Sequence, residues 1–248
     1  MKRIAGIAAV IATFVCIGAA GARAGFFDDL ATTVLGGGGT TGGGASGLDD
    51  GTIVKGLKEA LSTGTTRAVK VVSQRDGYFG NEVIKILLPE KVRSTADLLS
   101  RFGFQKEVDE VVLGMNRAAE KAAPKATEHF VAALKAMTFD DARGILNGGN
   151  TAATDYFKRS TGQAIHSSFR PVISGSMQQV GLLKSYKSMN DSLATIPFAG
   201  SMASFDLEEY VTSRAVDGLF VMLGEEEKKI RTDPVARGTE LLKKVFGR

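Results

Sequence analysis

Beyond residue 48, apolar residues recur every three or four positions through most of the chain, which is the spacing of one face of an α-helix. The first such stretch carries Ile53, Leu57 and Leu61, and either Asp49 or Asp50 can serve as its N-cap. The pattern therefore predicts that a helical region begins at this point.

Proline, glycine and capping residues divide the pattern that follows into separate helices. Pro89 fits the first turn of a helix that ends at Gly103. A long stretch over 105–137 should be kinked or broken by Pro124, and Pro171 should interrupt a later helix. The remaining predicted helices span 138–147 with the capping box Thr138-x-x-Asp141, then 151–180, 182–193, 206–230 with Asp206 as its cap, and 234–246.

One short run has a different character. Val83–Leu88 reads VIKILL, which suits a buried strand, although no pairing partner is evident in the sequence. The expected fold class is all-α, a compact multi-helix bundle with at most one short β segment near Val83–Leu88. We expect residues 48–248 to form a single helical domain.

Residues 1–24 have the pattern of a secretory signal peptide. Lys2 and Arg3 precede an uncharged, mostly apolar run, and the sequence ARA at 22–24 supplies a small-x-small cleavage pattern. Cleavage after Ala24 would start the mature chain at Gly25 and place the protein in the periplasm. The alternative is an uncleaved anchor, because the apolar run approaches the length of a membrane span.

Residues 25–47 join this leader to the helical region. A short amphipathic segment carries Phe26, Phe27 and Leu30, which offer a peripheral contact to a membrane. The segment 36–47 then reads GGGGTTGGGASG, and so many glycines favour a flexible linker, because burial of this segment would not offset its backbone entropy.

The charge balance and the cysteine content limit the classes of partner and compartment that the sequence supports. The leader holds three of the 31 basic residues and none of the 27 acidic ones, so the mature chain would be almost neutral. We therefore expect no nucleic-acid partner, which a strong basic field would indicate. The single cysteine, Cys16, would leave with the leader, which suits an oxidising compartment.

The motifs that carry catalysis, nucleotide binding or metal binding are missing, so we expect no catalytic residue, metal or cofactor. One set of polar residues is a candidate ligand site. Asn116, Arg117 and Glu120 share one helix face, and Glu227 and Arg231 are one helical turn apart on another. The two arginines could hold an anionic group, with Glu120 as the nearest sequence partner of Arg117 and Glu227 as a candidate across helices.

The alternative for these residues is structural. Charged helix faces are usually solvated, and one or two interior ion pairs can fix how helices pack, so we favour this interpretation. The run Glu225–Lys229, EEEKK, looks like an exposed face for the same reason.

Several longer motifs resemble a known family. They are GLKEAL (56–61), DGYFGN (76–81), MNRAAEKAAP (115–124), MTFDDARGIL (137–146), AATDYF (152–157), DLEEYVTSRAVDGLF (206–220), EEKKIRTDPVAR (226–237) and LLKKVFG (241–247). Together they resemble the bacterial domain-of-unknown-function 4197 family over about residues 48–248. The resemblance implies an exported helical protein and transfers no activity to any residue.

Three functions stay open on the sequence. We favour a non-enzymatic helical protein of the bacterial envelope that binds a partner protein or an apolar small molecule. The second is a periplasmic enzyme that uses Asn116, Arg117, Glu120, Glu227 and Arg231. The third is a structural envelope protein that docks through its N-terminal segment.

Overall fold

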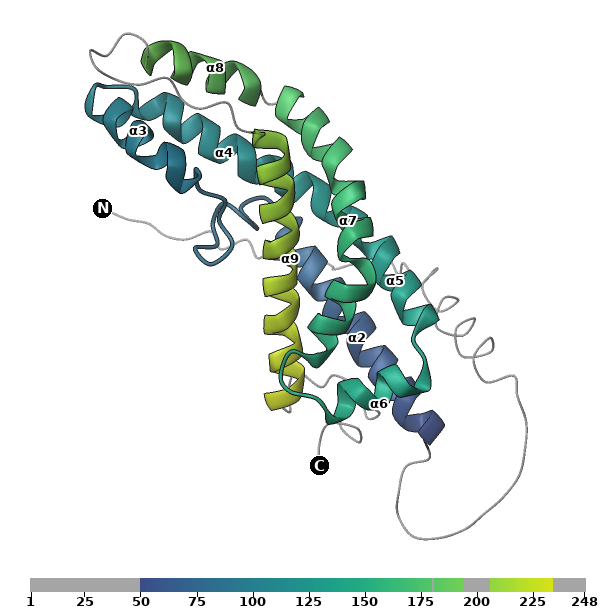
Figure 1. Ribbon diagram of the computed structural model, residues 1–248. Helices are drawn as coiled ribbons and strands as arrows, with labels where there is room; N and C mark the ends of the chain where they lie inside the picture. The colour runs from purple at the N-terminus through teal and green to yellow at the C-terminus, as the bar shows by residue number, and fades with distance from the viewer. Residues whose placement is uncertain (1–49, 180, 194–205, 234–248) are drawn as a thin grey trace, which may run out of the picture. The chain divides into compact units, whose positions relative to one another are not determined.

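The computed structural model of the chain describes residues 50–179, 181–193 and 206–233 (Figure 1). The elements in these ranges are α2 (Asp50–Val72), α3 (Glu90–Arg101), α4 (Gln105–Ala122), η1 (Ala123–Lys125), α5 (Ala126–Ala136), α6 (Phe139–Asn147), α7 (Ala152–Gln179), α8 (Leu182–Leu193) and α9 (Leu207–Thr232). The described residues contain no strand, so the predicted all-α class is confirmed. The predicted signal peptide, the glycine-rich linker with Phe26, Phe27 and Leu30, and the helix over 234–246 lie outside the described residues.

The helices pack as a bundle around α7 and α9. α9 lies against both α7 and α2, and α4 lies against α7, α8 and α9 (Figure 1). An aromatic cluster joins three of these elements, because the ring of Phe130 in α5 meets Phe157 in α7 at 5.2 Å and Phe220 in α9 at 6.1 Å, both edge to face. The hydroxyl of Tyr156 donates to the carbonyl of Ala133 at 2.9 Å and so satisfies the polar end of the same cluster.

Alanines allow α4, η1 and α5 to approach their neighbours closely. Pro124 converts the chain to a 3-10 turn between the two α-helices, as the sequence predicted. The side chains on either side of this turn are wholly buried and small: Ala118, Ala119, Ala122, Ala123 and Ala126.

Two predicted helix starts are confirmed by their hydrogen bonds. The hydroxyl of Thr138 accepts from the backbone N–H of Asp141 at 3.1 Å, and the Asp141 carboxylate accepts from the backbone N–H of Thr138 at 3.0 Å. At the start of α9 the Asp206 carboxylate accepts from the N–H of Glu209 at 2.9 Å. These bonds satisfy backbone donors that a helix N-terminus leaves unpaired.

The expected interruption at Pro171 is wrong, because α7 runs without a break from Ala152 to Gln179. A proline inside a helix costs about 3 kcal/mol. Buried side chains continue on one face on both sides of it, namely Ile165, Phe169, Ile173 and Met177. Burial of such side chains contributes about 1.5 to 3 kcal/mol each, so the stripe outweighs the proline.

Val83–Leu88 is not a strand but an irregular segment between α2 and α3. Its side chains still alternate, with Val83 77% exposed and Ile86 1% exposed. The side-chain amide of Asn116 takes the place of a neighbouring strand: its oxygen accepts from the N–H of Ile86 and its nitrogen donates to the carbonyl of Ile86, both at 2.8 Å. The hydroxyl of Tyr210 donates to the carbonyl of Leu87 at 2.7 Å. Side chains therefore satisfy this backbone, which removes the need for a second strand.

Replacement of Asn116 should therefore destabilise the fold. Asn116→Ala leaves the N–H and the carbonyl of Ile86 buried without partners, and we expect a loss of roughly 2 to 4 kcal/mol in the free energy of unfolding. Urea denaturation measures this loss, and amide exchange at Ile86 should become faster in the variant. Gln105→Ala, on the exposed face of the same helix, is the control and should change stability by less than about 0.5 kcal/mol. Equal midpoints for the two variants would contradict the interpretation.

The capping box at Thr138 makes a pH-dependent contribution. Hydrogen bonds from the Thr138 side chain and backbone hold the pKa of Asp141 below its ordinary value of 3.8. A lowered folded-state pKa means that this stabilisation is present above the unfolded pKa and is lost as the pH falls through the folded value.

We therefore expect Asp141→Ala to cost about 1 kcal/mol at pH 7, and the difference from wild type should shrink in strongly acidic buffer. Urea midpoints at both pH values check this. Asp140→Ala, which removes only an interaction with the helix dipole, should cost a few tenths of a kcal/mol. A loss at Asp141 that is the same at both pH values would argue against the capping role.

Candidate functional site

The five polar residues predicted from the sequence lie in two places, with Asn116, Arg117 and Glu120 on α4 and with Glu227 and Arg231 on α9. Each place holds a cluster of ion pairs, and Asn116 lies beside the first cluster, bonded to Ile86. In the first, Arg117 on α4 joins two carboxylates: its Nη1 donates to Glu120 Oε2 and its Nη2 to Asp76 Oδ1, each at 2.6 Å. The other oxygen of Glu120 accepts from the backbone N–H groups of Tyr78 and Phe79, both at 3.2 Å. Glu120 is only 5% exposed, so its charge is balanced by an arginine and two main-chain donors.

The cluster fixes the connection between α2 and α3 against α9. Tyr78 in this connection is wholly buried, and its hydroxyl donates to the carbonyl of Ala215 at 2.6 Å. Burial, with the charge of Glu120 as a smaller cause, raises the pKa of Tyr78 far above its ordinary value of 10.0. A Cβ at Gly218 would come within 2.8 Å of the Tyr78 ring, so α9 needs a glycine here to accept the ring.

The two carboxylate partners of Arg117 stabilise its charged form. Burial lowers the pKa of its guanidinium, but the hydrogen bonds and charges of Glu120 and Asp76 more than offset this, and the net shift is upward. Its side chain is 23% exposed, and the guanidinium also lies 5.7 Å from the ring centre of Phe79.

The second cluster joins α9 to the start of α7 and the end of α6. One oxygen of Glu227 accepts from the N–H of Ala153 at 3.0 Å, and the other accepts from the N–H and the hydroxyl of Thr154, both at 2.8 Å. Arg231 donates to Glu227 at 2.9 Å and to the carbonyl of Ile145 at 2.9 Å. A buried carboxylate thus caps α7 from another helix, where the helix dipole also favours negative charge.

The structure does not pair Arg117 with Glu227, which the sequence left open as an interhelical contact. Arg117 pairs with Glu120 and Asp76 instead. Gly218 on α9 lies beside Tyr78 of the first cluster. At the rise of an α-helix, Gly218 is about 14 Å along α9 from Glu227, so the two clusters are apart. All five predicted residues therefore serve the main chain or each other in two places, and their ability to bind a ligand stays a prediction.

The expected exposure of the whole run Glu225–Lys229 is wrong. Glu226 and Glu227 are each only 6% exposed, whereas Glu225 and Lys228 face solvent. Glu226 is paired with Lys229 at 2.7 Å. The helical period of α9 turns two of the three glutamates inward, and their burial is tolerated because each has a cationic partner.

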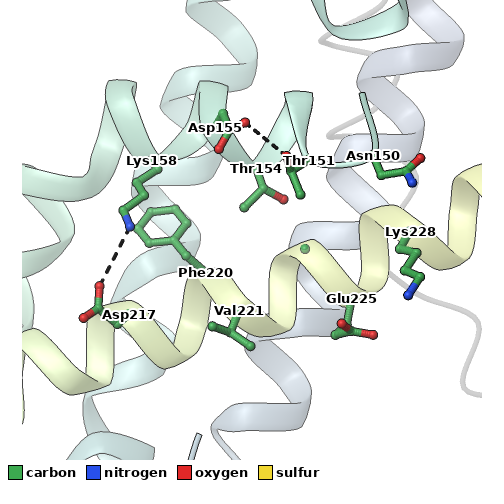
Figure 2. A pocket seen from close by; sticks show the side chains of 11 residues that line it. Asn150, Thr151, Thr154, Asp155, Lys158, Asp217, Phe220, Val221, Glu225 and Lys228 are labelled. Atoms are coloured by element: carbon green, nitrogen blue, oxygen red, sulfur yellow. Dashed lines mark hydrogen bonds and ion pairs between the residues drawn. The ribbon is translucent and has the colours of Figure 1, made fainter. Parts of the chain in front are cut away.

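A cleft lies elsewhere, between the beginning of α7 and the middle of α9, with a volume of about 650 Å³ (Figure 2). None of the five predicted residues lines it. Its walls carry charges of both signs, and its floor includes the buried side chains of Phe220 and Thr154. The complete lining is Asn150, Thr151, Thr154, Asp155, Lys158, Asp217, Phe220, Val221, Gly224, Glu225 and Lys228.

The sequence does not predict this cleft. The residues on its two walls are separated by about 60 to 80 positions in the chain, and each wall alone has the pattern of an ordinary charged helix face. The nearest signal was the helix start at Asn150 and Thr151, which places polar groups at one end of the cleft.

Both histidines join helices. His129 Nε2 lies 2.7 Å from Ser168 Oγ, and His166 Nε2 lies 3.0 Å from Glu209 Oε1. Neither histidine lines the cleft, and within the described ranges no group of histidines, cysteines and acidic residues is arranged to hold a metal ion. Among the helices in those ranges, none is both long and apolar enough to cross a membrane.

The Arg117 cluster gives a stability prediction. Arg117→Met leaves the buried Glu120 carboxylate without its cation, so we expect a loss of about 3 kcal/mol in the free energy of unfolding. Glu120→Gln in the same chain removes that charge and should recover part of the loss. Urea denaturation measures both. Lys106→Met, which breaks an ion pair whose lysine side chain is 84% exposed, should cost less than about 1 kcal/mol. A midpoint for Arg117→Met at or above wild type would show that the cluster does not stabilise the fold.

Comparison with known proteins identifies a family. A family model described as "Protein of unknown function (DUF4197)" matches residues 47–247, and no curated protein or solved structure matches. The match covers the helices that hold both clusters and the cleft, and it confirms the family to which the sequence motifs pointed. The chain therefore belongs to the DUF4197 family, whose function is unknown.

Proposed function

We propose that this is an exported helical protein of the bacterial envelope that acts by binding another molecule rather than by catalysis. The observation that carries the proposal is the use of its buried polar side chains. Asn116, Glu120 and Glu227 all accept from backbone N–H groups of the same chain. A catalytic acid, base or nucleophile must instead face a substrate, within hydrogen-bond reach of the atom that reacts.

The arginines support the same interpretation. Arg117 and Arg231 each donate to a carboxylate of the protein. An arginine that binds an anionic substrate presents its donors to that substrate, and bidentate contacts are typical. For the enzymatic alternative to hold, these ion pairs would have to open during the reaction.

The cleft between α7 and α9 supports a binding role. Its volume of about 650 Å³ is within the range of small-molecule sites, which are commonly about 300 to 1,000 Å³. Most of its lining residues are polar or charged, but apolar atoms contribute much of its surface, which favours a ligand with both polar and apolar parts over the wholly apolar ligand that the sequence left open.

Export is the other half of the proposal, and it rests on the sequence of residues 1–24. A positive start, an apolar run and a small-x-small motif before Gly25 are typical of a cleaved secretory signal. Docking through Phe26, Phe27 and Leu30 is compatible with this proposal, since those residues would begin the mature chain.

Fractionation of the natural host tests the proposal. We expect the protein in the periplasmic fraction, with Gly25 as its first residue by N-terminal sequencing. Native mass spectrometry of this material should show an added mass from a bound partner or ligand. Recovery in the cytosol with Met1 intact would contradict export. A turnover of substrate that Glu227→Gln abolishes, in a variant that remains folded, would favour the enzymatic alternative.

A further inference from the structure

We infer that the cleft between α7 and α9 binds a short peptide that carries a basic group, an acidic group and one apolar side chain. This inference rests on the proposed binding function and specifies its ligand. It is drawn from the charges of the two walls, the chemistry of the floor and the space beside one glycine.

The walls present charges of both signs within one cleft (Figure 2). The α7 wall carries Asp155 and Lys158, and the α9 wall carries Asp217, Glu225 and Lys228. A wholly anionic ligand would meet three carboxylates, and a wholly cationic ligand would meet two ammonium groups. A ligand with one charge of each sign can pair with both kinds, which is the charge pattern of a short peptide.

The ion pair across the cleft is weak enough to be replaced. Lys158 Nζ lies 3.9 Å from Asp217 Oδ1, and the two side chains are 60% and 55% exposed. Exposed pairs at such distances contribute little to stability. A ligand can therefore exchange this contact for its own charges at small cost.

The floor adds a place for one apolar side chain. Phe220, which is 4% exposed, and Val221, which is 42% exposed, are the two apolar side chains among the lining residues. Asn150 and Thr151 lie at one end and can hydrogen-bond to the amide groups of a peptide. A wholly apolar ligand would cover the charged walls without pairing them, which is costly.

Gly224 has no side chain and so leaves space in the cleft that it lines. A Cβ at this position would lie 3.7 Å from Thr154 Oγ1 and 4.0 Å from Thr154 Cγ2, both ordinary contacts. The packing of α9 therefore does not require glycine here, and a larger side chain would occupy the cleft. Gly224→Leu should therefore fill the site. The variant should remain folded, because leucine is a better helix former than glycine.

The probe is an equimolar mixture of N-acetylated, C-amidated tripeptides Lys-X-Glu, in which X is alanine, valine, leucine, isoleucine or phenylalanine, added to the ¹⁵N-labelled full chain. We expect amide chemical-shift changes centred on Thr154, Phe220, Val221 and Gly224. The mixture Gln-X-Gln with the same blocked termini should bind roughly three- to twentyfold more weakly, because two exposed ion pairs are lost. Shift changes that are absent or lie elsewhere, or equal binding of the two mixtures, would overturn the inference.

Gly224→Leu should lose the shift changes at the floor, with an unchanged pattern of shifts in α2–α5 to show that it is folded. Gly144→Leu is the matched control, because a Cβ at this exposed helical glycine meets nothing within 4 Å, and the variant should bind as wild type does. Binding retained by Gly224→Leu would exclude the cleft.

The same pair of variants separates this inference from the proposed function. A partner that co-purifies with wild type and with Gly224→Leu alike would leave the binding function in place and overturn the cleft as its site. Tripeptide shifts at the cleft, for a protein that the host retains in the cytosol with Met1 intact, would support the cleft and count against the proposed role as an exported envelope protein.

Discussion

The carboxylate of Glu120 is the group on which the connection between α2 and α3 depends. A helix satisfies its own backbone internally, but a buried connection between helices has donors and acceptors that need other partners. Glu120 accepts two of these donors, and Asn116, one turn earlier on α4, bonds to both backbone groups of Ile86. Glu227 does the same at the start of α7. Three polar side chains thus replace hydrogen bonds that strands or local caps would otherwise supply.

Glu120 and Glu227, the two buried carboxylates among these side chains, each need a cation. Arg117 and Arg231 supply it, and each arginine also reaches a second acceptor on another element, Asp76 in one case and the carbonyl of Ile145 in the other. A buried carboxylate left without such a partner would cost several kcal/mol. The two clusters are therefore best understood as units, in which removal of one member costs more than the pair itself contributes.

The clusters and the cleft share a residue, which links stability to the proposed binding. Thr154 donates its hydroxyl to Glu227 and forms part of the cleft floor opposite Gly224. The position of the α7 wall thus depends on the Glu227 carboxylate beneath it. The charged groups on the cleft walls, by contrast, are exposed and pair weakly, so they can exchange partners without loss of the fold.

The sequence by itself determined the helical class, the capping box at Thr138, the break at Pro124 and the family, because these depend on residues close together in the chain. Tertiary structure decided the rest. The stripe packed along α7 carries the helix through Pro171, and Asn116 makes a strand at Val83–Leu88 unnecessary. Asp76 rather than Glu227 is the second partner of Arg117, and the cleft forms from walls about 60 to 80 residues apart. Such contacts depend on which helix faces meet, and a periodic pattern gives the face of each helix but not its neighbour.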